Sequence, residues 1–343
     1  MTASTTADLT PRQRRLVLAT VGLSLMAVVS AVAGLNVALP SLAVETGASQ
    51  TQLTWIVDSY TVVFAGLLLI AGALGDRYGR KVMLLIGLVI FGGGAAMGLF
   101  VTDPDQLIAV RMVMGVGAAA IMPTTLSVIT TSFPEEERGR AIGVWVGIAG
   151  GGAIIGLFVT ALLLEWFSWS SFFGLNVAFA TVGLIGAITV VPQSVDEEPP
   201  ALDIVGAVLS FVAISAFVFG IIEGPERGWD DALTLGPIIL GVGAGIAFVL
   251  WELRLEHPLL DPRLFRLRGF SAGSLTIVVQ FMASFGFFFV VLQYLQFVTG
   301  RSPLEAALAM MPLPFVLIPT ARNAPKIADK VGFNRTGPIG LLS

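Results

Sequence analysis

The sequence contains no cysteine and only one histidine among 343 residues. The lack of cysteine excludes disulfide bonds, thiolate nucleophiles and cysteine-bound metals. The histidine, His257, stands in a polar connector, where a single imidazole cannot assemble a metal cluster or a Ser-His-Asp triad. The sequence shows no nucleophile and base in a catalytic pattern either. We therefore expect neither an enzyme nor a protein that binds a metal or another cofactor.

Charge is also scarce. Charged residues make up 12% of the chain and hydrophobic residues 55%, with a mean hydropathy of +0.89, whereas a soluble domain carries roughly 25% charged residues. So little charge cannot cover a surface that faces water. The composition predicts that a lipid bilayer surrounds the chain, and the net charge of −4 gives no indication of nucleic acid binding.

Apolar runs recur that are long enough to cross a bilayer, which takes about 20 helical residues. We predict ten spans, near 16–40, 53–75, 82–101, 106–130, 141–164, 171–192, 204–222, 233–251, 270–296 and 304–321, and the start of an eleventh at 336–343. A backbone in lipid must satisfy its own hydrogen bonds, so the spans are expected to be helices. The predicted fold class is an all-α polytopic membrane protein.

Lysine and arginine are sorted to one side of the predicted spans. All but three of the 19 lie in alternate connectors that begin with the N-terminal tail; the exceptions are Arg227, Arg301 and Arg111, which falls inside a span. Because positive residues are retained on the cytoplasmic side, we expect an inner-membrane protein with a cytoplasmic N-terminus. The first apolar run exceeds the length of a signal-peptide core, so it is expected to be retained as a span.

The polar interruptions divide the chain into five predicted parts. These are an N-terminal tail (1–15), a six-helix bundle (16–192), a cytoplasmic linker (193–203), an accessory helix pair (204–252), and a cytoplasmic loop with an incomplete second bundle (253–343). An internal repeat supports the last part, because the pattern Asp-basic-x-Gly at Asp76 occurs again as Asp329, Lys330 and Gly332. Many transporters are built from duplicated bundles of this kind.

The connector GALGDRYGRK at 72–81 spaces glycines around an acid and three bases. Glycines let two helix ends approach closely, and an acid here can pair with a base or cap a helix. The connector resembles the loop signature of the major facilitator superfamily, G-x-L-a-D-r-x-G-r-k. A solvated positive loop would explain the bases but not the glycines. The resemblance implies a conformational gating loop formed by Gly72, Gly75, Asp76, Arg77, Gly79, Arg80 and Lys81.

Further segments extend the resemblance to the fourteen-helix drug:proton antiporter branch of that superfamily. They are NVALP at 36–40, WIVDSY at 55–60, GPERGW at 224–229, and the loop from HPLL at 257–260 to LFR at 264–266. The resemblance implies alternating access and proton-coupled efflux. The implied partners are the lipid bilayer, protons and a small amphipathic, drug-like or cationic substrate.

Two ionisable residues inside predicted spans are candidates for proton coupling. A charge at mid-bilayer is costly, so Arg111 is expected to face the bundle interior, where it resembles the arginine that the family uses in proton coupling. The alternative is that Arg111 snorkels or pairs statically with backbone carbonyls. Asp58 could exchange a proton for a cationic substrate, or it could simply meet water at the outer rim.

A substrate cavity is predicted from Asn36, Trp55, Tyr60, Phe285 and Tyr294, although such aromatics also face lipid or other helices.

The sequence differs in two places from the pattern of the fourteen-helix branch. Ala31 stands where an acid is expected, and Gly156-Leu157 and Thr160-Ala161 replace the Gly-Pro and Gly-Gly of the exporter motif. The kink-making proline and the close-packing glycines are thus missing. These losses fit either a changed substrate or decay, and the chain stops just inside the eleventh span. The alternative function is therefore a truncated or degenerate relative, inactive in transport, that acts as a membrane binding or scaffold protein.

Overall fold

A computed structural model describes residues 9–195, 202–256, 258–313 and 316. The secondary structure in this part of the chain is helical, and no strand occurs in it. Nine of its helices are long and apolar enough to cross a membrane, which confirms the prediction of a polytopic all-α membrane protein. The chain forms two compact units, Met1–Asp261 and Pro262–Ser343.

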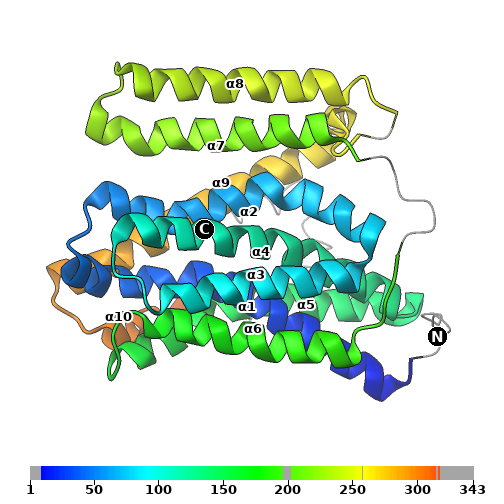
Figure 1. The fold of residues 1–343 in the computed structure, drawn as a ribbon, viewed down its shortest axis with the longest axis horizontal. Coiled ribbons are helices and arrows are strands. Elements are labelled where there is room, and N and C mark those ends of the chain that lie inside the picture. Colours follow the sequence, from blue (N-terminus) through cyan, green and yellow to red (C-terminus); the bar gives the residue numbers. More distant parts are fainter. Residues whose placement is uncertain (1–8, 196–201, 257, 314–315, 317–343) are drawn as a thin grey trace. The chain divides into compact units, whose positions relative to one another are not determined.

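The first unit contains eight long helices (Figure 1). They are α1 (Pro11–Thr46), α2 (Gln50–Tyr78), α3 (Arg80–Gly98), α4 (Pro104–Ser132), α5 (Glu135–Leu164), α6 (Ser171–Val190), α7 (Ile204–Arg227) and α8 (Ala232–Glu252). Each corresponds to one predicted span. Several helices extend past the predicted ends, because hydropathy marks only the part in hydrocarbon, whereas helices end where their terminal backbone groups are capped.

Capping residues explain these longer ends. The side chain of Thr10 caps the first turn of α1 in a reciprocal capping box with Gln13, and Ser49 does the same for α2 with Gln52. Between them, Gly47 adopts the left-handed conformation (φ 68°) that ends α1. Both boxes lie outside the apolar runs, so the helices carry polar first turns beyond the predicted spans.

The helices α1 to α6 pack as one bundle, in which α1 contacts α4, α5 and α6, and α4 packs between α2 and α3. The crossing of α1 with α5 is close. A Cβ at Gly34 would lie 2.5 Å from Thr160 Oγ1, and a Cβ at Gly156 would overlap Ser30. Close packing is therefore retained here although the exporter motif is altered, because small residues on both helices provide the space.

The remaining helices of the first unit, α7 and α8, form an antiparallel pair that joins the bundle through α7 and α2 (Figure 1). The ring of Phe211 on α7 lies against Gly66 of α2, where a Cβ would meet it at 2.6 Å. Within the pair, Gly241 of α8 lies against the backbone of Phe217 on α7. The predicted accessory pair is thus in direct contact with the second helix of the bundle.

The second unit begins with a short 3-10 helix, η2 (Pro262–Arg266), followed by α9 (Arg268–Gln293). A π-helical segment, η3 (Tyr294–Val298), continues α9, so that together they match the predicted ninth span. The helix α10 (Pro303–Ala309) starts where the tenth span was predicted. Most of the rest of that span, the predicted start of an eleventh, and the repeat residues Asp329, Lys330 and Gly332 lie outside the described residues.

Candidate functional site

Arg111 is the most enclosed charged residue of the candidate site. It lies on α4, its side chain is fully buried, and its Nε donates a 2.9 Å hydrogen bond to the carbonyl of Ile56 on α2. Its Nη2 donates a longer bond of 3.5 Å to the carbonyl of Val57. These two hydrogen bonds are the contacts expected from one of the alternatives for Arg111, static pairing with backbone carbonyls. Its role in proton coupling stays a prediction.

The ring of Tyr60 covers the guanidinium group. The Cζ atom of Arg111 lies 4.2 Å from the ring centroid, a distance at which the π face attracts a cation. The Tyr60 hydroxyl donates a 3.0 Å hydrogen bond to the carbonyl of Val28 on α1. Tyr60 therefore connects α1, α2 and the buried charge of α4, and it is fully buried itself.

The backbones of α2 and α4 approach closely around this group. A Cβ at Gly115, one turn beyond Arg111 on α4, would lie 2.6 Å from the carbonyl oxygen of Tyr60. Only glycine fits at this position. The approach brings the carbonyls of α2 within reach of the Arg111 side chain, which a longer interhelical distance would prevent.

One polar atom of this group remains without a hydrogen bond. Within the described residues, Nη1 of Arg111 is buried and has no partner. A buried donor without a partner costs about 1–3 kcal/mol. The site therefore has the capacity to accept one more oxygen ligand, such as water or a substrate group.

Asp58 lies on α2 next to the carbonyl of Val57 that Arg111 contacts. Its side chain is partly exposed, and it interacts electrostatically with Arg111 although the two groups form no ion pair within 4.0 Å. The structure thus brings together the two residues predicted for proton coupling. A separated pair differs from a closed salt bridge because the acid can gain or lose a proton without breaking a direct contact.

The predicted gating loop joins α2 to α3 in a tight turn around Gly79, whose φ of 108° is unfavourable for other residues. Asp76 and Arg80 form a salt bridge of 3.0 Å across one helical turn. The preceding glycines lie beside α4, since a Cβ at Gly75 would be 3.0 Å from Thr124 Cγ2 and one at Gly72 would be 3.6 Å from Pro123 Cβ. The glycines thus lie at close approaches and the acid is paired with a base, while the gating role of the loop stays a prediction.

The same loop is attached to the end of α6. The backbone N–H of Arg80 donates a 3.0 Å hydrogen bond to the carbonyl of Ser194, and Lys81 Nζ donates one of 2.9 Å to the carbonyl of Ile188. Gly79 lies against the side chain of Gln193, which would overlap a Cβ there. The loop is therefore fixed to the chain that follows the sixth helix, a contact that sequence analysis did not identify.

A second contact missed by sequence analysis ties α2 to α7. Trp55 Nε1 donates a 2.7 Å hydrogen bond to Oε1 of Glu223, and the Arg227 Nε donates one of 2.6 Å to Oε2 of the same carboxylate. The rings of Trp55 and Phe219 also pack with centroids 5.5 Å apart. Trp55 lies in the WIVDSY segment at 55–60, and Glu223 directly precedes the GPERGW segment at 224–229. The two segments occur together in the fourteen-helix branch, but neither segment specified a contact.

The residues predicted to line a substrate cavity have different environments. Tyr60 is enclosed beside Arg111, Trp55 binds Glu223, and Asn36 is buried with its Nδ2 donating a 3.0 Å hydrogen bond to the carbonyl of Val32 in its own helix. Phe285 and Tyr294 belong to the second unit and are about half exposed. A cavity formed by all five stays a prediction.

Several known proteins with similar sequences are resistance proteins. The chain is 34% identical over 279 residues to the puromycin resistance protein pur8 of Streptomyces alboniger, which covers 81% of this chain and 55% of that protein. It is 36% identical over 285 residues to the methyl viologen resistance protein SmvA of Salmonella typhimurium, covering 81% and 57%. It is 33% identical over 305 residues to the multidrug resistance protein Stp of Mycobacterium tuberculosis, covering 88% and 56%. The chain thus spans somewhat more than half the length of these relatives.

Solved structures and a family model agree on the fold. The crystal structure of the POT family transporter PepTSo matches with a TM-score of 0.63 at 15% identity, over 94% of this chain and 71% of that one. A peptide transporter POT in complex with sulfate matches with a TM-score of 0.62 at 18% identity, over 92% and 69%. At such identities the likeness shows the fold alone. The family model described as Major Facilitator Superfamily matches residues 21–343, and the chain belongs to that superfamily.

Proposed function

We propose that the protein is a drug efflux transporter of the inner membrane, with a cytoplasmic N-terminus, that exports small amphipathic molecules in exchange for protons by alternating access. Membership of the superfamily and the resistance proteins among its relatives support export of drug-like compounds. The sorting of lysine and arginine to one set of connectors supports the orientation.

The electrostatic interaction of Asp58 with Arg111 at the α2–α4 contact is the observation that carries the proposal. Arg111 is held by carbonyls and by the Tyr60 ring, so its position does not depend on Asp58. When Asp58 is ionised, the guanidinium attracts it; when Asp58 binds a proton, that attraction disappears. A ligand shifts a conformational equilibrium only by its difference in affinity for the two states. Loss of this attraction on protonation would be such a difference.

A cationic substrate would compete with the proton for the same carboxylate. An ionised Asp58 attracts a cation, whereas the neutral acid does not, so that proton binding favours substrate release. Nη1 of Arg111, which has no hydrogen-bond partner in the described part of the chain, offers a position for a water molecule or a polar substrate group next to this carboxylate. The gating loop would couple the exchange to rocking of the bundles, because the salt bridge between Asp76 and Arg80 joins the end of α2 to the start of α3.

Reconstitution of the full-length protein in proteoliposomes with an imposed proton gradient tests the proposal. Methyl viologen and puromycin serve as probes, since they appear in the names of two relatives. We expect gradient-driven transport of at least one probe by the wild type and its loss in Asp58→Asn. Asp105→Asn is the matched control, because Asp105 is an exposed acid in the first turn of α4 whose carboxylate accepts a hydrogen bond from Nε2 of Gln52. Unchanged transport by Asp58→Asn would refute the role of Asp58.

The second candidate is a membrane binding protein without transport activity. Ala31, which replaces the expected acid of the first helix, is fully buried, so no carboxylate is available at that position. If wild-type proteoliposomes bind a probe in equilibrium dialysis but move neither probe nor protons, this candidate replaces the exporter.

A further inference from the structure

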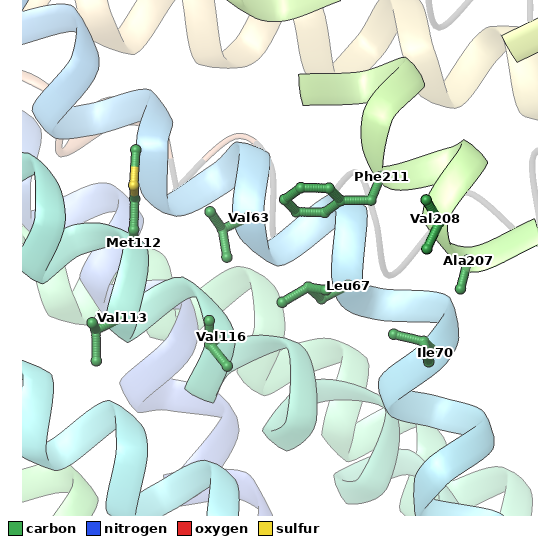
Figure 2. Close-up of a pocket in the computed structure, with 9 residues that line it drawn as sticks. All are labelled: Val63, Leu67, Ile70, Met112, Val113, Val116, Ala207, Val208 and Phe211. Carbon is green, nitrogen blue, oxygen red and sulfur yellow. The ribbon is translucent and has the colours of Figure 1, made fainter. Parts of the chain in front are cut away.

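A groove with only apolar walls lies between the six-helix bundle and the accessory pair. Its volume is about 430 Å³, and it is lined by Val63, Leu67 and Ile70 of α2, Met112, Val113 and Val116 of α4, and Ala207, Val208 and Phe211 of α7. Figure 2 shows that these side chains come from three separate helices, with α2 forming the wall between the other two. The volume falls within the ~300–1,000 Å³ of small-molecule sites.

The chemistry of the walls selects the kind of occupant. Sites for drug-like molecules combine apolar walls with a few polar groups that fix the orientation of the ligand. None of the nine lining residues carries a polar side chain. The groove therefore suits a hydrocarbon chain, which needs contact but no hydrogen bond. Each helix that lines it is long and apolar enough to cross a membrane.

An empty groove of this kind is unfavourable in a bilayer. Wall atoms without neighbours lose their dispersion contacts, and α7 does not close the gap because its Phe211 ring rests on Gly66 of α2 instead of reaching α4. Val113 and Val116 of α4 consequently remain more than one-third exposed. A chain from the surrounding lipid would restore these contacts.

The side chain of an arginine, Arg77, lies beyond one end of the groove. On α2, the sequence positions 63, 67, 70, 74 and 77 follow one face of the helix in steps of four and three residues, so Arg77 continues the line of the groove. It lies about 10 Å beyond Ile70 along the helix axis. This is the end where α2 stops at Tyr78 and α7 starts at Ile204. Because the apolar runs of both helices end here, we expect this end to lie at the level of the lipid headgroups.

Among the residues that the structure describes, Arg77 is also the one base of the gating loop without a partner. Arg80 pairs with Asp76, and Lys81 binds the carbonyl of Ile188. Arg77 is exposed and forms no hydrogen bond or salt bridge with any of the residues described. We propose that one anionic phospholipid is bound here, with an acyl chain in the groove of α2, α4 and α7 and its phosphate at Arg77.

Native mass spectrometry of the full chain tests the acyl-chain site. The protein is purified from membranes, and is also exchanged into vesicles of phosphatidylglycerol and phosphatidylethanolamine in equal amounts. We expect retained phospholipid on the wild type and a loss of most of it in Val208→Trp, whose indole fills the groove. Val182→Trp on α6 is the matched control, since Val182 and Val208 are 56% and 54% exposed. Equal lipid retention in both variants, or none in the wild type, would overturn the proposal.

The headgroup contact is tested with Arg77→Gln. We expect the preference of the bound lipid for phosphatidylglycerol over phosphatidylethanolamine to fall roughly fivefold, the factor for one basic residue near an anionic membrane surface. Arg140→Gln, which removes an exposed arginine of α5, should leave the preference unchanged. An unchanged preference in Arg77→Gln, or wild-type binding without a preference, would show that Arg77 does not hold the headgroup. These readouts do not depend on transport.

Discussion

Trp55 and Glu223 are 168 residues apart in the sequence and are joined by a 2.7 Å hydrogen bond from the indole nitrogen to the carboxylate. Because Glu223 is buried and also binds Arg227, the bond links α2 of the bundle to a charged pair on α7. Together with Phe211 against Gly66, it gives the accessory pair two points of attachment to α2, one nearer each end of the helix. The pair is thus expected to move with the first bundle.

Replacing Trp55 by Phe should weaken this attachment. The variant keeps a ring beside Phe219 but removes the donor, and a hydrogen bond to a charged group contributes about 1.5–3 kcal/mol. Because Glu223 retains Arg227, we expect the lower end of that range. Thermal unfolding in detergent measures the change, with Trp166→Phe as control because Trp166 is 71% exposed. Equal shifts in the two variants would show that the hydrogen bond adds nothing.

Arg111→Lys should destabilise the contact of α2 with α4. An ammonium group cannot reproduce the planar arrangement in which Nε and Nη2 reach two carbonyls while the guanidinium lies over Tyr60. The lost cation–π contact alone is worth about 0.5–2 kcal/mol. We expect a lower unfolding temperature and a loss of probe transport, whereas Arg15→Lys at an exposed site should change neither. A variant as stable as the wild type would contradict the contacts described.

The helices were predictable because membrane spans need long apolar runs, and the burial of Arg111 was predictable because a charge in hydrocarbon must face polar partners. The identity of those partners was not, because it depends on how closely α2 and α4 approach at Gly115. Sequence analysis left backbone pairing and proton coupling as alternatives. The structure shows the backbone contacts and places Asp58 nearby, while the coupling role stays a prediction.

The contacts between helices distant in sequence were harder to foresee. The connector at 72–81 predicted a gating loop through its glycines and charges, and that role stays a prediction. Its attachment to Ser194 and Ile188 follows from the packing of α3 against α6. Likewise, Trp55 lies in a recognisable motif at 55–60, and Glu223 directly precedes the one at 224–229. Their hydrogen bond exists because α7 packs on α2, and hydropathy alone does not specify which helices become neighbours.

Gly79→Ala should loosen the gating loop. The backbone at φ 108° disfavours any other residue by about 1–3 kcal/mol, and the new Cβ would meet Gln193. We expect faster trypsin cleavage after Arg77, Arg80 and Lys81. Gly47→Ala is the control, because Gly47 also has a positive φ of 68° but no atom within 4 Å of a Cβ. If both variants are cleaved in the loop at the wild-type rate, the attachment to the end of α6 does not order it.

Gly156→Ala tests the crossing of α1 and α5 against a control on the same helix. Alanine favours a helix over glycine by up to about 1 kcal/mol wherever it fits, and at Gly150 a Cβ would meet nothing within 4 Å. At Gly156 the Cβ would overlap Ser30, and overpacking costs about 1–3 kcal/mol. We therefore expect Gly150→Ala to raise or preserve the unfolding temperature in detergent and Gly156→Ala to lower it. Equal unfolding temperatures would mean that α1 and α5 can separate at little cost, and that the close approach is not needed for stability.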